Sequence, residues 1–197
     1  FLQEGDEIII GESEHHSNIV PWQLLSERKH LNIKVLPVNE CGRLKIEDLY
    51  YLINPRTRLV CISHVSNVLG VVNLVGFVAE ICRRYGVTVI ADEIHCDFIR
   101  PGIKFTSFAT LGDEYKEKLI LCTAPSKTFN LAGLQVSNIW IPNPEIREQF
   151  KKENRANGYN EINALGMMAA EACYNQGKPW LTELKAYLEG NIAFVKD

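Results

Sequence analysis

The chain has 197 residues, of which 46% are hydrophobic and 23% charged, a composition typical of globular domains. This length allows one sizeable hydrophobic core or at most two small domains. The formal net charge of −3 and the pI near 6.0 exclude a strongly basic protein. We therefore expect no nucleic-acid partner and no anionic-membrane partner.

The chain starts with FLQEGDEIII, which lacks an initiator methionine and the basic and apolar regions of a signal peptide. No apolar run approaches the roughly 18 residues that a membrane span requires. Six scattered cysteines form no Cys-x-x-Cys pair, which favours a reduced, cytoplasmic protein over a disulfide framework. Because the first residues lie beside a predicted strand, we expect the sequence to be a piece of a longer chain.

Short apolar runs alternate with amphipathic segments along most of the chain. In chain order, the runs typical of strands are EIII (7–10), IKVLPV (33–38), RLVCIS (58–63), VTVIA (87–91), KLILCTA (118–124) and VSNIWI (136–141). Between them, helix spacing with charged faces marks 22–30, 46–53 and 74–86, the last ending at Gly86. After Pro142 the pattern predicts consecutive helices over 145–154, 162–175 and 179–195.

Several predicted strands are apolar throughout, as strands covered on both faces are. The alternation therefore predicts an α/β domain with a mainly parallel sheet sandwiched by helices. We find no internal repeat, low-complexity tract or linker, and expect a single domain over residues 1–197.

Polar side chains follow four predicted strands, at the edge where ligands bind in such sheets. They are Glu14, His15 and His16; His64, Ser66 and Asn67; Asp92, Glu93 and His95; and Ser126 and Lys127. Such a coincidence at four strand ends predicts a ligand site.

Zinc is one alternative ligand, but the spacing of these residues matches no standard zinc signature, and we expect no metal. The zinc ligands would be Glu14, His15, His16, His64 and His95. Cys96 and Cys122 are interpreted as packing residues rather than nucleophiles, and Glu93 as a supporting carboxylate.

These residue types suit pyridoxal 5′-phosphate (PLP), an aldehyde cofactor with a basic ring nitrogen. The amine of Lys127 could form a Schiff base with the aldehyde. The carboxylate of Asp92 could keep the ring nitrogen protonated, which makes the ring an electron sink. Asn67 could donate to the ring oxygen, and an imidazole could stack on the ring. Each residue also has an alternative without a cofactor. Lys127 and His15 could lie in solvent-exposed loops, and Asp92 and Asn67 could stabilise local turns.

Two motifs, ADEIHCDF (91–98) and APSKTFNLAGLQVSN (124–138), resemble the MalY/PatB-type cystathionine β-lyases of the fold-type I PLP enzymes. The resemblance runs from about residue 78 to the end. It implies that Lys127 is the Schiff-base lysine and Asp92 the partner of the ring nitrogen. It also implies that His95 contacts the ring oxygen and that Ser126 contacts the phosphate.

The first third resembles a different branch, the SufS-type cysteine desulfurases, through GDEIIIGESEHHSNIVPWQLL (5–25) and RLVCISHVSNVLGVVN (58–73). This resemblance implies that His15 stacks on the PLP ring and that Asn67 contacts the ring oxygen. The change of likeness near residues 73–80 suggests a mosaic of two branches, natural or engineered.

Together the resemblances imply the large domain of a PLP-dependent transferase-like fold without its small domain. They imply cleavage of carbon–sulfur bonds by β-elimination, with a small sulfur-containing amino acid as substrate and a homodimer as the assembly. The alternatives are a cysteine desulfurase, and a PLP-binding fragment or recombined scaffold without turnover.

Overall fold

The computed structural model describes residues 2–66, 69–159 and 161–196. The chain divides into two compact units, Phe1–Ile90 and Ala91–Asp197, and each is described by itself. Both combine strands with helices, in agreement with the predicted α/β class.

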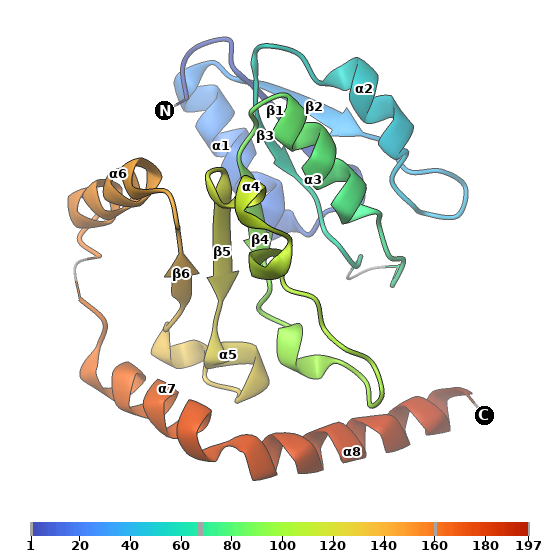
Figure 1. Ribbon diagram of the computed structural model, residues 1–197, viewed down its shortest axis with the longest axis vertical. Coiled ribbons are helices and arrows are strands. Elements are labelled where there is room, and N and C mark those ends of the chain that lie inside the picture. Colours follow the sequence, from blue (N-terminus) through green and yellow to red (C-terminus); the bar gives the residue numbers. More distant parts are fainter. Residues whose placement is uncertain (1, 67–68, 160, 197) are drawn as a thin grey trace. The chain divides into compact units, whose positions relative to one another are not determined.

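The first unit is built on a parallel three-stranded sheet in the order β2-β1-β3 (Figure 1). Its strands are β1 (Glu7–Gly11), β2 (Asn32–Leu36) and β3 (Thr57–Cys61). All five residues of β1 are buried, because this central strand is covered on both faces, as its apolar run predicts. The edge strand β2 is more exposed, and Val35 retains 49% of its accessible surface.

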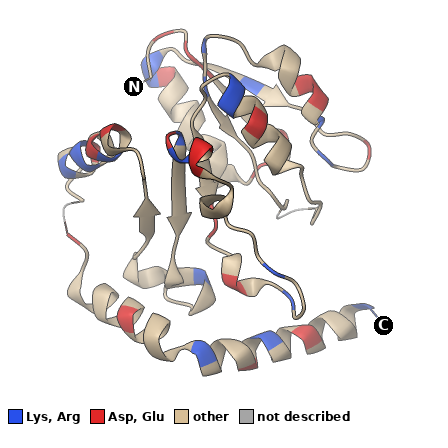
Figure 2. Cartoon of the chain, viewed as in Figure 1, with Lys and Arg blue, Asp and Glu red and all other residues tan. Residues whose placement is uncertain are grey.

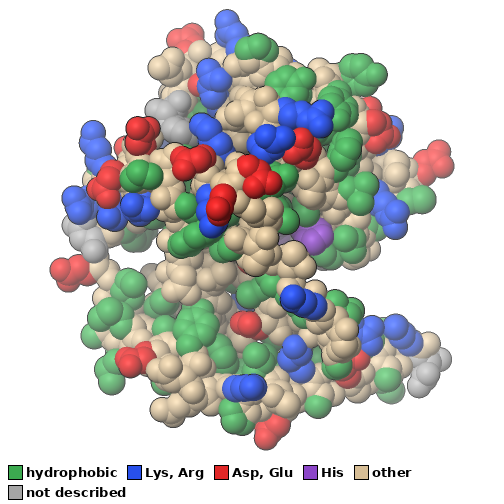
Figure 3. Space-filling view, in the orientation of Figure 1, with side chains coloured by type: hydrophobic (Ala, Val, Ile, Leu, Met, Phe, Trp, Pro, Cys, Tyr) green, Lys and Arg blue, Asp and Glu red, His purple; other side chains and the backbone are tan. Residues whose placement is uncertain are grey.

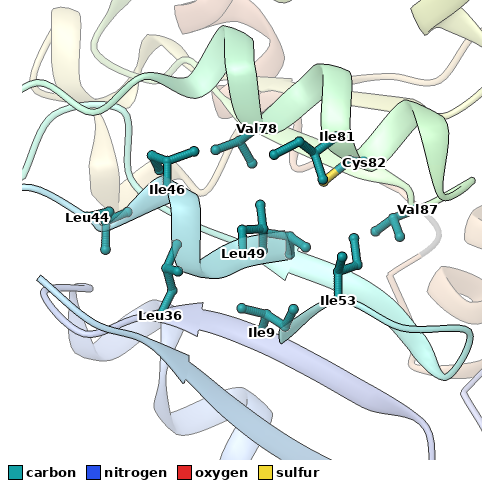
Figure 4. Packing of buried hydrophobic residues seen from close by; sticks show 11 residues of the cluster. Ile9, Leu36, Leu44, Ile46, Leu49, Ile53, Val78, Ile81, Cys82 and Val87 are labelled. Carbon is teal, nitrogen blue, oxygen red and sulfur yellow. The ribbon is translucent and has the colours of Figure 1, made fainter. Parts of the chain in front are cut away.

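Helices cover the two faces of this sheet. Side chains alternate between the faces of a strand, so Ile8 and Ile10 pack with residues of α1 (Val20–Lys29). On the other face, Ile9 packs with residues of α2 (Leu49–Leu52) and α3 (Val75–Arg84) (Figure 4).

One predicted helix, over 46–53, is only partly α-helical. The segment 46–53 forms a 3₁₀ turn, Ile46–Asp48, followed by the single turn α2. The chain becomes extended at Ile53. Pro55 disfavours helical backbone at Asn54, the residue before it, so the helix cannot continue through this segment. The predicted end of α3 is confirmed, since Gly86 follows it with a φ of 67°, a conformation that favours glycine.

The second unit contains a sheet in the order β4-β5-β6, in which β6 runs antiparallel to β5. The strands are β4 (Val89–Asp92), β5 (Leu119–Thr123) and β6 (Asn138–Trp140). The first unit ends at Ile90, within β4. The helices are α4 (Asp113–Lys116), α5 (Pro125–Thr128), α6 (Pro144–Ala156), α7 (Ala164–Gln176) and α8 (Lys178–Lys196). The three consecutive helices predicted after Pro142 are confirmed.

Charges of both signs are mixed on the helices, as α6 shows in Figure 2. Hydrophobic side chains gather on the surface over α7 (Figure 3), where Leu165 and Met168 are 71% and 68% exposed. Within the described ranges, no helix is both long enough and apolar enough to span a membrane.

Candidate functional site

In the second unit, the predicted site residues follow two neighbouring strands. The backbone N–H of Glu93, directly after β4, donates to the carbonyl of Cys122 in β5 at 2.8 Å. Asp92 closes β4 and is exposed, and its Oδ1 accepts a hydrogen bond from the N–H of Ile94 at 3.1 Å. In the part of the chain that the structure describes, its Oδ2 has no hydrogen-bond partner, so one carboxylate oxygen is available to a ligand.

Lys127 lies on α5, a one-turn helix, where the sequence suggests only a polar turn. The helix begins at Pro125, whose fixed φ and missing N–H suit a first helical position. Pro125 and Thr128 are buried while Lys127 is exposed. Within the described segments its amine has neither a hydrogen-bond nor an ion-pair partner. The amine is therefore accessible to a ligand.

Ser126 is half-buried on the same turn. Its carbonyl accepts from the N–H of Leu131 at 2.9 Å, and its hydroxyl has no partner within the described ranges. His95 is exposed and lies at the start of the 3₁₀ turn Cys96–Phe98, with its ring centroid 6.0 Å from that of Phe98. A carboxylate, an imidazole, a hydroxyl and an amine thus follow adjacent strands of one unit.

Glu93 serves the structure of the loop that follows β4. Its Oε1 accepts from the N–H of Phe108, and its Oε2 accepts from the hydroxyl of Ser107, both at 2.7 Å. These contacts engage both carboxylate oxygens and agree with the interpretation of Glu93 as a supporting carboxylate.

Side chains that the sequence did not single out anchor α5 and the residue after it. The hydroxyl of Thr128 donates to Oδ2 of Asp97 at 2.8 Å. The next residue, Phe129, packs edge-on against Tyr174 and also contacts Trp180, with ring centroids 6.3 and 5.7 Å away. Asp97 lies within the motif ADEIHCDF, and Thr128 and Phe129 lie within SKTFN. No local sequence pattern pairs Asp97 with Thr128, however.

In the first unit, Glu14 is buried and His15 is exposed. Glu14 accepts hydrogen bonds from Asn18 and Ser63, so its role is to join the loops after β1 and β3. His15 Nδ1 lies 2.7 Å from the hydroxyl of Ser17, and its ring centroid lies 4.0 Å from that of His16. An exposed imidazole is available to stack on a ligand.

The loop after β3 carries the remaining predicted residues. Asn67 lies outside the described residues, so its predicted contact with the PLP ring stays a prediction. Ser66 is buried, and its hydroxyl accepts from the N–H of Leu69 at 3.1 Å. His64 is exposed. The described residues contain no group of three or more His, Cys, Asp or Glu side chains that could hold a metal ion.

Several thiols are poor nucleophiles at neutral pH. Burial raises the pKa of Cys61 and Cys82 to about 12 and that of Cys122 to about 11. Burial also raises the pKa of Cys96, with further contributions from the charges of Asp97 and Glu93. Because the thiolate is the attacking form, these four cysteines are suited to packing.

Comparisons with known proteins agree with the motifs. The family model described as "Aminotransferase class-V" matches residues 1–95, which extends past the change of likeness near 73–80. The cystathionine beta-lyase PatB of Bacillus subtilis (strain 168) is 47% identical over 113 residues, which cover 57% of this chain and 29% of that protein. A cysteine desulfurase of Wigglesworthia glossinidia brevipalpis is 39% identical over 140 residues, or 64% of this chain and 34% of that protein.

Two solved structures extend the likeness over the fold. Cystalysin from Treponema denticola, which contains a PLP cofactor, has a TM-score of 0.86 and 29% identity, covering 100% of this chain and 51% of its own. The PLP-bound C-S lyase from Staphylococcus hominis has a TM-score of 0.81 and 26% identity, covering 98% and 49%. The chain spans about a third of these curated relatives and about half of these solved structures. The chain thus resembles the fold-type I PLP-dependent enzymes, with similarity to both their cystathionine β-lyases and their cysteine desulfurases.

Proposed function

We propose that this chain forms the PLP-binding part of an enzyme that cleaves carbon–sulfur bonds in cysteine-like amino acids by β-elimination. One observation carries the proposal: Lys127, exposed and without a partner among the described residues, follows β5, while the Asp92 carboxylate closes the neighbouring strand β4. Similarity to a cystathionine β-lyase and to C-S lyase structures supports the class of reaction.

The residues present fit PLP. When bound, this cofactor supplies a ring that withdraws electrons from the substrate's Cα. Lys127 offers the primary amine that bonds an aldehyde, and once released the same amine can take the Cα proton as a general base. The available oxygen of Asp92 can accept the ring N–H and hold the proton on that nitrogen.

Four further residues would orient the cofactor. We assign His95 to its ring oxygen and Ser126 to its phosphate, since both polar groups are available in the second unit. His15 would stack on the ring and Asn67 would also contact the ring oxygen; these two assignments rest on the desulfurase-like motifs alone.

In the proposed reaction the Cα–H and Cβ–S bonds of the substrate break. The departing sulfur takes up a proton to become a thiol, and water converts the remaining three-carbon skeleton to pyruvate and ammonia. A base and an electron-withdrawing ring suffice for this chemistry, and no protein thiol takes part.

Cysteine desulfuration is the second candidate, favoured by the relatives of that name. It requires a protein thiolate that attacks the substrate sulfur. Burial and the charges of Asp97 and Glu93 raise the pKa of Cys96, on the turn after β4, which makes its thiol a weaker nucleophile at neutral pH. Among the residues that the structure describes, the available groups therefore support the elimination better than the desulfuration.

Covalent labelling tests the site. The chain is incubated with PLP, reduced with borohydride and digested, and the modified lysine is mapped by mass spectrometry. We expect the label on Lys127, its loss in Lys127→Ala, and its retention in Lys118→Ala, an exposed lysine just before β5. A label spread over other lysines would overturn the assignment.

Product analysis with cystathionine then tests the reaction, for which we expect pyruvate from the parent and none from Lys127→Ala. A chain that is labelled at Lys127 but yields no product would instead be a PLP-binding scaffold without turnover.

The proposal includes a cytoplasmic homodimer. All six cysteines are free, which suits a reducing compartment. The exposed apolar side chains over α7, among them Leu165 and Met168, suit a contact between subunits. Light scattering after size-exclusion chromatography should give twice the chain mass, and Leu165→Lys should lower it. A monomeric parent would contradict the dimer.

A further inference from the structure

We propose that Asp97 is a positioning residue for Lys127, acting through the hydroxyl of Thr128. The inference rests on the proposed function of Lys127 and deepens it, because it names what fixes the reactive amine. All the groups involved belong to the second unit.

The contact between the two side chains is well defined. Thr128 Oγ1 donates to Oδ2 of Asp97 at 2.8 Å. The Thr128 side chain is fully buried, with 0% exposure, and Asp97 is partly buried. A hydrogen bond to a charged acceptor in such surroundings is stronger than one between neutral groups. A buried hydroxyl without that acceptor would carry a desolvation cost.

The helix that carries Lys127 depends on such external contacts. With four residues, α5 is far too short to be stable by itself. Its own backbone supplies the bond from the N–H of Phe129 to the carbonyl of Pro125, at 2.9 Å. Thr128 directly follows Lys127, so fixing the threonine side chain fixes the rotation of the turn. That rotation sets the direction in which the lysine leaves the helix.

The same bond ties the lysine helix to the segment that follows Asp92. Asp97 lies on the turn Cys96–Phe98, a few residues after the end of β4. Tyr174 of α7 lies close enough for Asp97 to affect it: burial raises the pKa of Tyr174, and the charge of Asp97 adds to the rise. The Asp97 carboxylate thus links the loop after β4 to α5 in the vicinity of α7. It limits how far Lys127 can move from the strand that ends in Asp92.

The test compares variants of the full chain by PLP labelling with borohydride. Thr128→Val keeps the shape of the side chain and removes the hydroxyl that donates to Asp97. It should slow labelling of Lys127 by about tenfold or more, because a small displacement of a reacting group slows its reaction at least that much. Any background labelling of Lys118 should be the same in the variant and in the parent. Thr128→Ser should restore the parent rate. Thr182→Val is the matched control, because it removes an exposed threonine hydroxyl that donates within α8.

A second measurement is independent of the cofactor. Hydrogen exchange at the amides of Phe129 and Leu131, which bond to Pro125 and Ser126, should be faster in Thr128→Val and in Asp97→Ala. Unchanged exchange in both variants would overturn the inference. Faster exchange with parent-like labelling of Lys127 would also overturn it, because the contact would then support the fold alone. If the parent is not labelled at Lys127, the proposed function fails, and hydrogen exchange still decides whether Asp97 fixes α5.

Discussion

The buried carboxylate of Glu14 accepts hydrogen bonds from both the backbone N–H and the hydroxyl of Ser63, 49 residues later, each at 2.6 Å. The pair joins the loop after β1 to the end of β3. His15 follows Glu14 directly, so these bonds fix the loop that carries the predicted stacking histidine.

Glu14→Gln should therefore destabilise the chain. One carboxylate oxygen becomes an amide NH₂ that faces the donors Ser63 and Asn18, and such a mismatch costs about 1–3 kcal/mol. Urea unfolding followed by circular dichroism measures the change. Glu27→Gln is the control, since Glu27 is exposed on α1. Equal stability of Glu14→Gln and the control would contradict the structural role of Glu14.

The core of the first unit allows a second stability prediction. Leu49 of α2 is fully buried against the sheet (Figure 4), so Leu49→Ala should cost about 2–5 kcal/mol through lost burial and the cavity left behind. Leu24→Ala, at a position on α1 that is 57% exposed, should cost much less. Similar unfolding midpoints for the two variants would contradict this packing.

The strands were predictable because they contain short apolar stretches, which are longest in β1 and β5. EIII contains four residues of β1 and LILCT is all of β5. The longer helices were predictable from their spacing and their endings, as α3 and Gly86 illustrate. These signals are local, so the sequence alone contains them.

Tertiary contacts account for what the sequence could not predict. α5 has one turn and hence no periodicity, and its anchor Asp97 is 31 residues away from Thr128. Glu14 is likewise bonded to a distant residue, Ser63, which lies 49 residues away in the chain. The motifs led to Asp92 and Lys127 as candidate site residues, but the supporting contacts appear only in the folded unit.

Buried thiols predict a loss of stability at alkaline pH. The pKa of Cys82 rises from 9.0 to about 12 on folding, so below pH 9 the thiol is protonated in both states and has no effect. Above pH 9 the unfolded state loses its proton first, and stability falls by about 1.4 kcal/mol per pH unit for this group. In Cys82→Ala, the fall of the unfolding free energy between pH 9 and 11 should be smaller than in the parent by about 1.4 kcal/mol per pH unit.

Val78→Ala is the matched control for that measurement. It removes buried atoms from the same cluster but keeps the thiols of Cys61 and Cys82, so its slope should equal that of the parent. If Cys82→Ala has the parent slope as well, the thiol ionises equally in the folded and unfolded states.

Asp92→Asn should separate attachment of the cofactor from turnover. Lys127 remains, so borohydride labelling at that lysine should continue. The amide cannot hold the ring proton by charge, and pyruvate formation from cystathionine should fall by about a hundredfold or more. Asp113→Asn, an exposed position on α4, should behave like the parent. Parent-like turnover of Asp92→Asn would remove this aspartate from the mechanism.

Replacing Cys96 discriminates between the two sulfur chemistries. Its pKa is raised by burial and by the charges of Asp97 and Glu93, so the thiol is a poor nucleophile at neutral pH. If the chain catalyses β-elimination, Cys96→Ala should form pyruvate within about twofold of the parent rate, because elimination needs no protein thiolate. A desulfurase using Cys96 would instead release alanine from L-cysteine and leave a persulfide on that residue. Both products would disappear in Cys96→Ala.

Product analysis with L-cysteine, with mass spectrometry of the Cys96 peptide, therefore decides between the lyase and a Cys96-dependent desulfurase. Alanine together with a Cys96 persulfide would reject the lyase.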